Sequence, residues 1–107
     1  MKAKPVKIAQ TTGYEECSIE EATHVTLNIP GPTGCLTLPF ILKGKREGTN
    51  AWTWNGDTEK PTLKPSVLTS YPNRFICHSF INDGKVQFLS DCTHELVNQT
   101  LDLLEVD

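Results

Sequence analysis

Apolar and polar residues alternate along several short segments of the chain, which is typical of half-buried β-strands. In residues 23–29, THVTLNI, the apolar residues Val25, Leu27 and Ile29 alternate with polar ones. The turn-forming run PGPTG follows, and CLTLPFIL, which starts at Cys35, shows the same alternation again. We therefore expect two strands joined by a tight connection.

A third strand is indicated by AWTWNG, where Trp52 and Trp54 share one face and would pack in the core or in an apolar wall. The polar segment KGKREGTN, residues 43–50, precedes it and reads as a solvated loop. Residues 59–73 contain several prolines, which cannot donate to a sheet ladder. We expect this stretch to be an edge strand or irregular.

The clearest turn signal is Asp83-Gly84, which lies between RFICHSFIN and KVQFLSD. This pair suits a two-residue hairpin loop because both residues tolerate positive φ. If it is the loop, Asn82 pairs with Lys85, and the register of the whole hairpin follows.

The fold class predicted is mainly β: one small antiparallel sheet with this hairpin near its centre. A length of 107 residues suits one domain, so residues 1–107 are treated as a single unit. The first residues, 1–16, are expected to be loosely ordered. After His94 the pattern is ambiguous between helix and strand, and we expect a short helical turn followed by a strand.

Composition narrows the range of partners. The net charge of −3 and the scattered distribution of lysine and arginine give no basic surface for nucleic acid. No apolar run is long enough for a membrane span, and the N-terminus lacks the apolar centre of a secretory signal. The expectation is a cytoplasmic protein in its host cell with a protein or peptide partner and no membrane or nucleic-acid partner, its oligomeric state left open.

The hairpin register brings metal-binding residue types together. Counting outward from the loop places His78 and Asp91 on one face as diagonal neighbours, and Cys77 and Cys92 on the other. His94 follows Asp91 by three residues, a spacing that a tight turn can fold back. We therefore predict one zinc ion held by Cys77, His78, Asp91 and His94. Ordinary buried or hydrogen-bonded roles for the same residues remain the alternative.

Which thiol completes this shell is left open, because a one-residue shift in the loop would exchange Asp91 for Cys92. Without an export signal the cysteines are expected to be reduced. Cys17 and Cys35 lack histidine or acidic neighbours and are interpreted as structural, and His24 as exposed. Ser66, in KPSVL, has no base nearby in the sequence, so a serine nucleophile is not favoured.

The segments WTWNGDTEKPTLKPSVLT and CHSFINDGKVQFLSDCTHELVNQTLDL together resemble a small domain family of unknown function found in tailed phages and prophages, sometimes mislabelled as ammonia monooxygenase. The resemblance covers about residues 30–103 and implies a phage or prophage origin. It also implies that His78, Asp91 and His94 form the core of the pattern. Relatives are associated with zinc-dependent peptidases, including cleavage of ubiquitin-like conjugates in bacterial operons.

Two function classes follow. In the first, the protein is a zinc-dependent hydrolase: His78, Asp91 and His94 hold the metal, zinc lowers the pKa of a bound water, and Glu95 takes its proton. In the second, it is a non-catalytic phage accessory or binding module in which Cys77 or Cys92 closes a structural zinc site.

Overall fold

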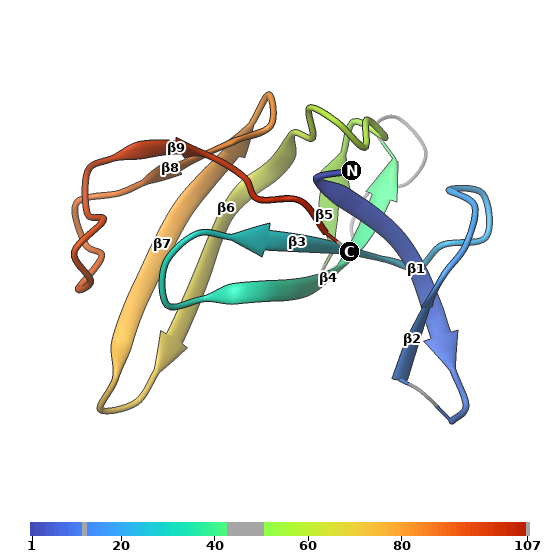
Figure 1. The fold of residues 1–107 in the computed structure, drawn as a ribbon, viewed down its shortest axis with the longest axis horizontal. Coiled ribbons are helices and arrows are strands. Elements are labelled where there is room, and N and C mark those ends of the chain that lie inside the picture. The colour runs from blue at the N-terminus through green and yellow to red at the C-terminus, as the bar shows by residue number, and fades with distance from the viewer. Residues whose placement is uncertain (12, 43–50, 107) are drawn as a thin grey trace.

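The computed structural model describes residues 1–11, 13–42 and 51–106, and these form a single sheet of nine strands (Figure 1). The strands are β1 (Ala3–Ala9), β2 (Gly13–Glu16), β3 (His24–Ile29), β4 (Gly34–Leu42), β5 (Trp52–Trp54), β6 (Leu63–Tyr71), β7 (Phe75–Asn82), β8 (Lys85–Phe88) and β9 (Thr100–Asp102). Their order across the sheet is β2-β1-β3-β4-β5-β6-β7-β8-β9. All neighbours are antiparallel except β4 and β5, which pair in parallel.

The sheet is open but curls, and the C-terminal segment spans the opening. After β9 this segment returns to β3, where the Leu104 amide donates to the Asn28 carbonyl at 2.9 Å. Two residues further on, the Val106 amide donates to the Met1 carbonyl at 2.8 Å. Met1 and Val106 are therefore neighbours, and the two chain ends lie close together in Figure 1.

The core fills the inside of the curl. Phe40 and Trp54 meet edge to face with ring centroids 4.8 Å apart, at the parallel pair β4–β5. The alternation in β3 matches this arrangement, because its apolar residues are all buried. The largest fully buried side chains are those of Trp54, Phe88, Leu27, Ile29, Leu63, Ile81 and Leu103.

The expected β-rich single domain, its tight connection between residues 29 and 34, and the hairpin at Asp83-Gly84 are confirmed. Asn82 pairs with Lys85, as counted from the turn. The hairpin is not central, however, since β7 and β8 stand near one end of the strand order. The sheet grows mainly on the other side, where it ends in β1 and β2, two strands that the sequence pattern did not indicate.

Three other expectations need correction. The described residues contain no helix: after His94 the chain makes successive turns in which Val97 and Gln99 each donate to the carbonyl three residues back. The described residues therefore include no helix that could cross a membrane. Residues 3–9 and 13–16, expected to be loosely ordered, form β1 and β2. The loop expected at 43–50 lies outside the described residues.

The proline-rich stretch is the third correction. It forms β6, which is an interior strand between β5 and β7 rather than an edge. The expected irregularity is nevertheless present, because the β6–β7 register shifts between Leu63 and Val67, around Pro65. A bulge of this kind is how an interior strand accommodates a residue without an amide donor.

We predict that Gly84→Ala destabilises the protein by about 2–4 kcal/mol in urea unfolding, because a Cβ in the left-handed region is strained. Gly84 has φ +77°, and a Cβ there would also lie 3.2 Å from the backbone of Glu59 and Lys60. Gly13→Ala is the matched control, since its φ is +86° but a Cβ would meet nothing within 4 Å. Its cost should be about 1 kcal/mol; equal losses in both variants would contradict the steric part of the explanation.

Candidate active site and thiol cluster

Three polar side chains on the outer face of the sheet are linked in a chain of hydrogen bonds. Ser66 Oγ lies 2.9 Å from His78 Nε2, and His78 Nδ1 lies 2.8 Å from Asp91 Oδ2. An ionised carboxylate can only accept, so the proton of a neutral imidazole resides on Nδ1 and Nε2 is left to accept from the serine hydroxyl. This arrangement of hydroxyl, imidazole and carboxylate has the geometry of the Ser-His-Asp triad of hydrolytic enzymes, which is defined by geometry and not by order in the sequence, and the three residues are called the triad below.

The strand pairing of β6 with β7 places the serine. Leu68 is the direct partner of His78, and Ser66 lies two residues before Leu68, which makes it a diagonal neighbour on the same face. The ladder shifts immediately beyond, between Leu63 and Val67, and bulges of this kind commonly re-aim side chains beside active sites. The indole of Trp52 fixes the serine backbone by donating to the Ser66 carbonyl at 3.2 Å.

The carboxylate is placed by a segment that continues along β7 after β8 ends. The Leu89 amide donates to the His78 carbonyl at 2.9 Å, and the Thr93 amide donates to the Ile76 carbonyl at 3.0 Å. Side chains replace the missing ladder bonds: Thr93 Oγ1 accepts from the Ile76 amide at 2.7 Å. Cys92 Sγ accepts from the His78 amide at 3.2 Å and donates to the His78 carbonyl at 3.1 Å. The short loop carrying Asp91 is therefore attached to the strand at His78 and at Ile76.

A second cluster lies on the inner face of the same strand. Ligand atoms of Cys77, Cys92 and His94 all lie within 4.8 Å of one another, and among the described residues this is the group of side chains that could hold a metal ion. Both cysteines are buried and reduced. Burial is the main cause that raises the pKa of the Cys77 thiol, so without a metal it is a thiol at neutral pH.

The imidazole of His94 is held by aromatic rings. It meets Phe88 edge to face at 4.9 Å and Phe75 at 6.3 Å between centroids. Its Nδ1 accepts from the Leu96 amide at 3.3 Å. Its Nε2 is buried and has no hydrogen-bond partner among the described residues, so one nitrogen of this ring lacks the partner that buried polar atoms normally have.

The four residues predicted to bind one zinc ion lie in two separate places in the structure. His78 and Asp91 are bonded to each other and to Ser66, whereas Cys77 and His94 join Cys92 in the separate cluster. The predicted hairpin register, which put His78 and Asp91 on one face and the two cysteines on the other, is confirmed. The structure does not bring all four predicted ligands together, because adjacent residues of a strand point to opposite faces.

The surroundings of Ser66 and His24 also differ from those expected. Ser66 does have a base, contrary to expectation, because the base comes from the neighbouring strand. Glu95, predicted to accept a proton from a metal-bound water, is exposed, and no hydrogen bond in the described residues joins its carboxylate to the triad.

Cys17 and Cys35 are free thiols outside the cluster, as expected. His24 is half-buried, with Nδ1 2.8 Å from the Thr23 hydroxyl.

A signal for the serine was present in the sequence. The run YPNRF, residues 71–75, is a turn between two apolar segments, and the structure pairs Tyr71 with Phe75 around it. Counting outward from that pair gives Leu68 opposite His78 and puts Ser66 diagonal to the histidine. The prolines argued against pairing this segment, and the second hairpin was missed for that reason.

Comparison with known protein families agrees with the outer site. A family model described as "Bacterial ubiquitination-like system serine protease (BubE)" matches residues 8–89, a range that includes Ser66 and His78 and ends just before Asp91. No curated protein and no solved structure matches the chain. Because the family model covers more than half of the sequence, the chain belongs to the BubE family. The phage or prophage origin stays a prediction.

We predict that iodoacetamide at neutral pH modifies Cys35 at least about 10-fold faster than Cys77, as measured by peptide mass spectrometry. Cys35 is exposed, whereas Cys77 is buried and its pKa is raised, so the reactive thiolate of Cys77 is scarce until the pH rises above the ordinary thiol range. In urea both cysteines should react at similar rates. Equal rates in the folded protein would show that the cluster is open to solvent.

Proposed function

We propose that this chain is a serine peptidase of a bacterial ubiquitination-like system, with Ser66 as nucleophile, His78 as general base and Asp91 as the group that orients the imidazole. The observation that carries the proposal is the pair of hydrogen bonds, at 2.9 Å and 2.8 Å, that connects the three side chains in the order a triad requires. The family description supports the same chemistry.

The first chemical step follows from this geometry. Ser66 Oγ attacks the carbonyl carbon of the scissile amide while its proton passes to His78 Nε2. The imidazolium that forms is stabilised by Asp91, which already accepts from Nδ1 at 2.8 Å. Collapse of the tetrahedral intermediate breaks the C–N bond, and the proton on Nε2 leaves with the amine. The product of this step is an acyl ester on Ser66.

The second step returns the enzyme to its starting state. A water takes the place of the departed amine, His78 Nε2 accepts its proton, and the hydroxide attacks the ester carbonyl. Ser66 Oγ then leaves with the proton that the imidazole returns. Since isopeptide and peptide bonds are both secondary amides, this chemistry suits a conjugate between a ubiquitin-like protein and a lysine, which is the substrate class we propose.

The cluster on the inner face supports a second, structural component: we propose that Cys77, Cys92 and His94 bind zinc. Two thiolates and an imidazole are ligands that zinc prefers. Their ligand atoms lie within 4.8 Å of one another, so small side-chain shifts would bring them to the bond lengths of about 2.0–2.3 Å that zinc requires. The buried His94 Nε2, which has no partner among the described residues, would serve as the ligand with the ring proton on Nδ1, a tautomer that gives up the bond from the Leu96 amide. When bound, zinc would supply a crosslink between β7 and the segment after β8.

The Cys92 sulfur makes this crosslink relevant to catalysis. As a thiol it donates to the His78 carbonyl at 3.1 Å, and as a zinc-bound thiolate it would lose that bond. It would still accept from the His78 amide, 3.2 Å away, and that bond is stronger to a charged sulfur. The proposed zinc would therefore keep Asp91, the neighbour of Cys92, in position beside His78.

Ser66→Ala should abolish both conjugate cleavage and covalent labelling by a fluorophosphonate probe, because the probe reacts with the same activated oxygen. Asp91→Asn should retain the fold and lower the rate about 10³-fold or more, since the imidazole loses the carboxylate that stabilises its charged form. Labelling is measured by intact-protein mass spectrometry, with Ser70→Ala, an exposed serine of the same strand, as control. Labelling that persists in Ser66→Ala would refute the proposal.

Metal analysis of natively purified protein should find about one zinc per chain. Cys77→Ser, Cys92→Ser and His94→Ala should each lose it and lower the melting temperature, because binding energy contributes to folding energy. His78→Ala and Cys35→Ser are the matched controls and should keep the metal. The opposite result for the two histidines, with zinc lost from His78→Ala and kept in His94→Ala, would restore the metal site expected from sequence.

A further inference from the structure

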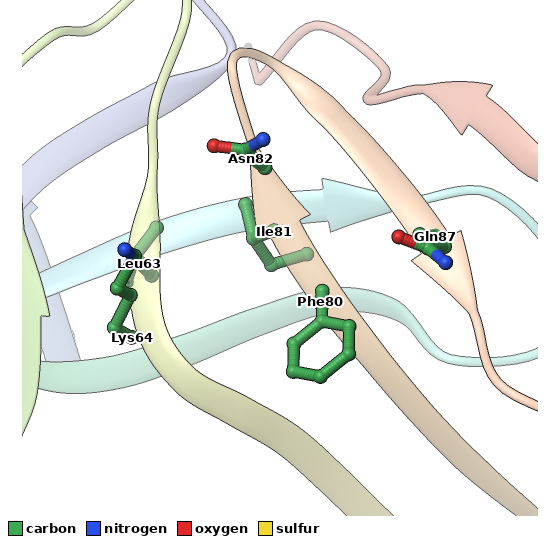
Figure 2. Close-up of a pocket in the computed structure, with 6 residues that line it drawn as sticks. All are labelled: Leu63, Lys64, Phe80, Ile81, Asn82 and Gln87. Atoms are coloured by element: carbon green, nitrogen blue, oxygen red, sulfur yellow. The ribbon is translucent and has the colours of Figure 1, made fainter.

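A pocket of about 260 Å³ lies beside the triad on the outer face of the sheet. Figure 2 shows Phe80 on β7 between Lys64 on β6 and Gln87 on β8, with Leu63 and Ile81 behind them. Lys64 precedes Ser66 by two residues and Phe80 follows His78 by two. Two residues of a regular strand span about 7 Å, so along β7 the pocket is one side-chain position away from His78.

The floor and wall of the pocket are apolar. Leu63 and Ile81 are each only 1 % exposed and belong to the core, whereas Phe80 is 46 % exposed and stands above the sheet. A ring this exposed on a small protein has apolar area available to a ligand. The pocket therefore suits the methylene groups of an entering side chain.

The rim of the pocket is polar and carries a single sign of charge. The described residues that line it include one cation, Lys64, and no carboxylate. Asn82 and Gln87 add amide groups that can donate hydrogen bonds. Lys64 is exposed and takes part in no ion pair within the described residues. In a chain of net charge −3, a positive pocket beside the active serine is a local departure from the overall charge.

We infer that this pocket is a specificity subsite for a carboxylate-bearing residue of the substrate. The methylene groups of that residue would pack on Phe80 and its carboxylate would meet the Lys64 ammonium. The inference rests on the proposed serine peptidase and adds a substrate preference to it. A glutamate side chain next to the scissile bond, or the free C-terminal carboxylate of a short peptide, presents this chemistry.

The test uses phosphonate probes that label Ser66 and differ only in the side chains next to the reactive phosphorus: glutamate, glutamine or lysine. We expect labelling about 3- to 5-fold faster with glutamate than with glutamine, a difference that one exposed charge pair can supply. Lys64→Gln should abolish the difference, and Lys64→Glu should reverse the preference toward lysine. Lys60→Gln, which removes an exposed lysine outside the pocket lining, should leave the preference as in the parent.

A second set of peptides separates the two sources of the carboxylate. Matched peptides that end in a free acid or in an amide are cleaved in competition. If the free acid is preferred, if Lys64→Gln removes that preference, and if the probes show no preference for glutamate, the pocket binds the C-terminal carboxylate. A simple fluorophosphonate reports the serine independently. If it labels the protein but neither carboxylate preference depends on Lys64, the subsite is refuted and the peptidase stands. If it does not label the protein, the proposed function and the subsite both fail.

Discussion

The pairing of β6 with β7 is the constraint on which both sites depend. Leu68 opposite His78 fixes the register, and from it the outer face receives Ser66 and the inner face receives Cys77. Because successive residues of a strand point to opposite faces, Cys77 and His78 serve different chemistries although they are adjacent. A shift of one residue would exchange them, so the register specifies the triad and the thiol cluster together.

The position of the triad explains why it needs support from the backbone. Asp91 is 57 % exposed and His78 25 %, so the two lie at the surface rather than in a closed cleft. An exposed pair gains little from its charge, since water screens the interaction. The geometry is instead maintained by contacts to the main chain, from Cys92 and Thr93 on one side and Trp52 on the other. A substrate that covers this face would exclude water and strengthen the same interactions.

The parts of the fold and the site that could be predicted are those whose signals lie within a short stretch of sequence. The Asp83-Gly84 turn and the alternation around it determined the β7–β8 hairpin and placed His78 beside Asp91 on one face. The serine required a second hairpin, and the prolines of β6 hid it because a bulge that absorbs Pro65 leaves no mark in the alternation pattern. The strands β1 and β2 and the returning C-terminal segment depend on long-range pairing, which no short window contains. Histidine, aspartate and cysteine are ligands for zinc and also parts of triads, so residue type alone could not separate the two sites.

The two sites are also physically coupled through Cys92. The Cys92 sulfur contacts the amide and the carbonyl of His78. Cys92 also lies between the two sites in the chain, since it directly follows Asp91 and precedes His94 by two residues. Any change in the state of this sulfur, whether thiol or metal-bound thiolate, alters a bond to the backbone of His78. Such a coupling acts in both directions. If metal binding stabilises the arrangement in which Asp91 contacts His78, that arrangement raises the affinity for the metal by the same factor. A small sheet with an exposed triad can in this way use its buried thiols to hold a surface site in place.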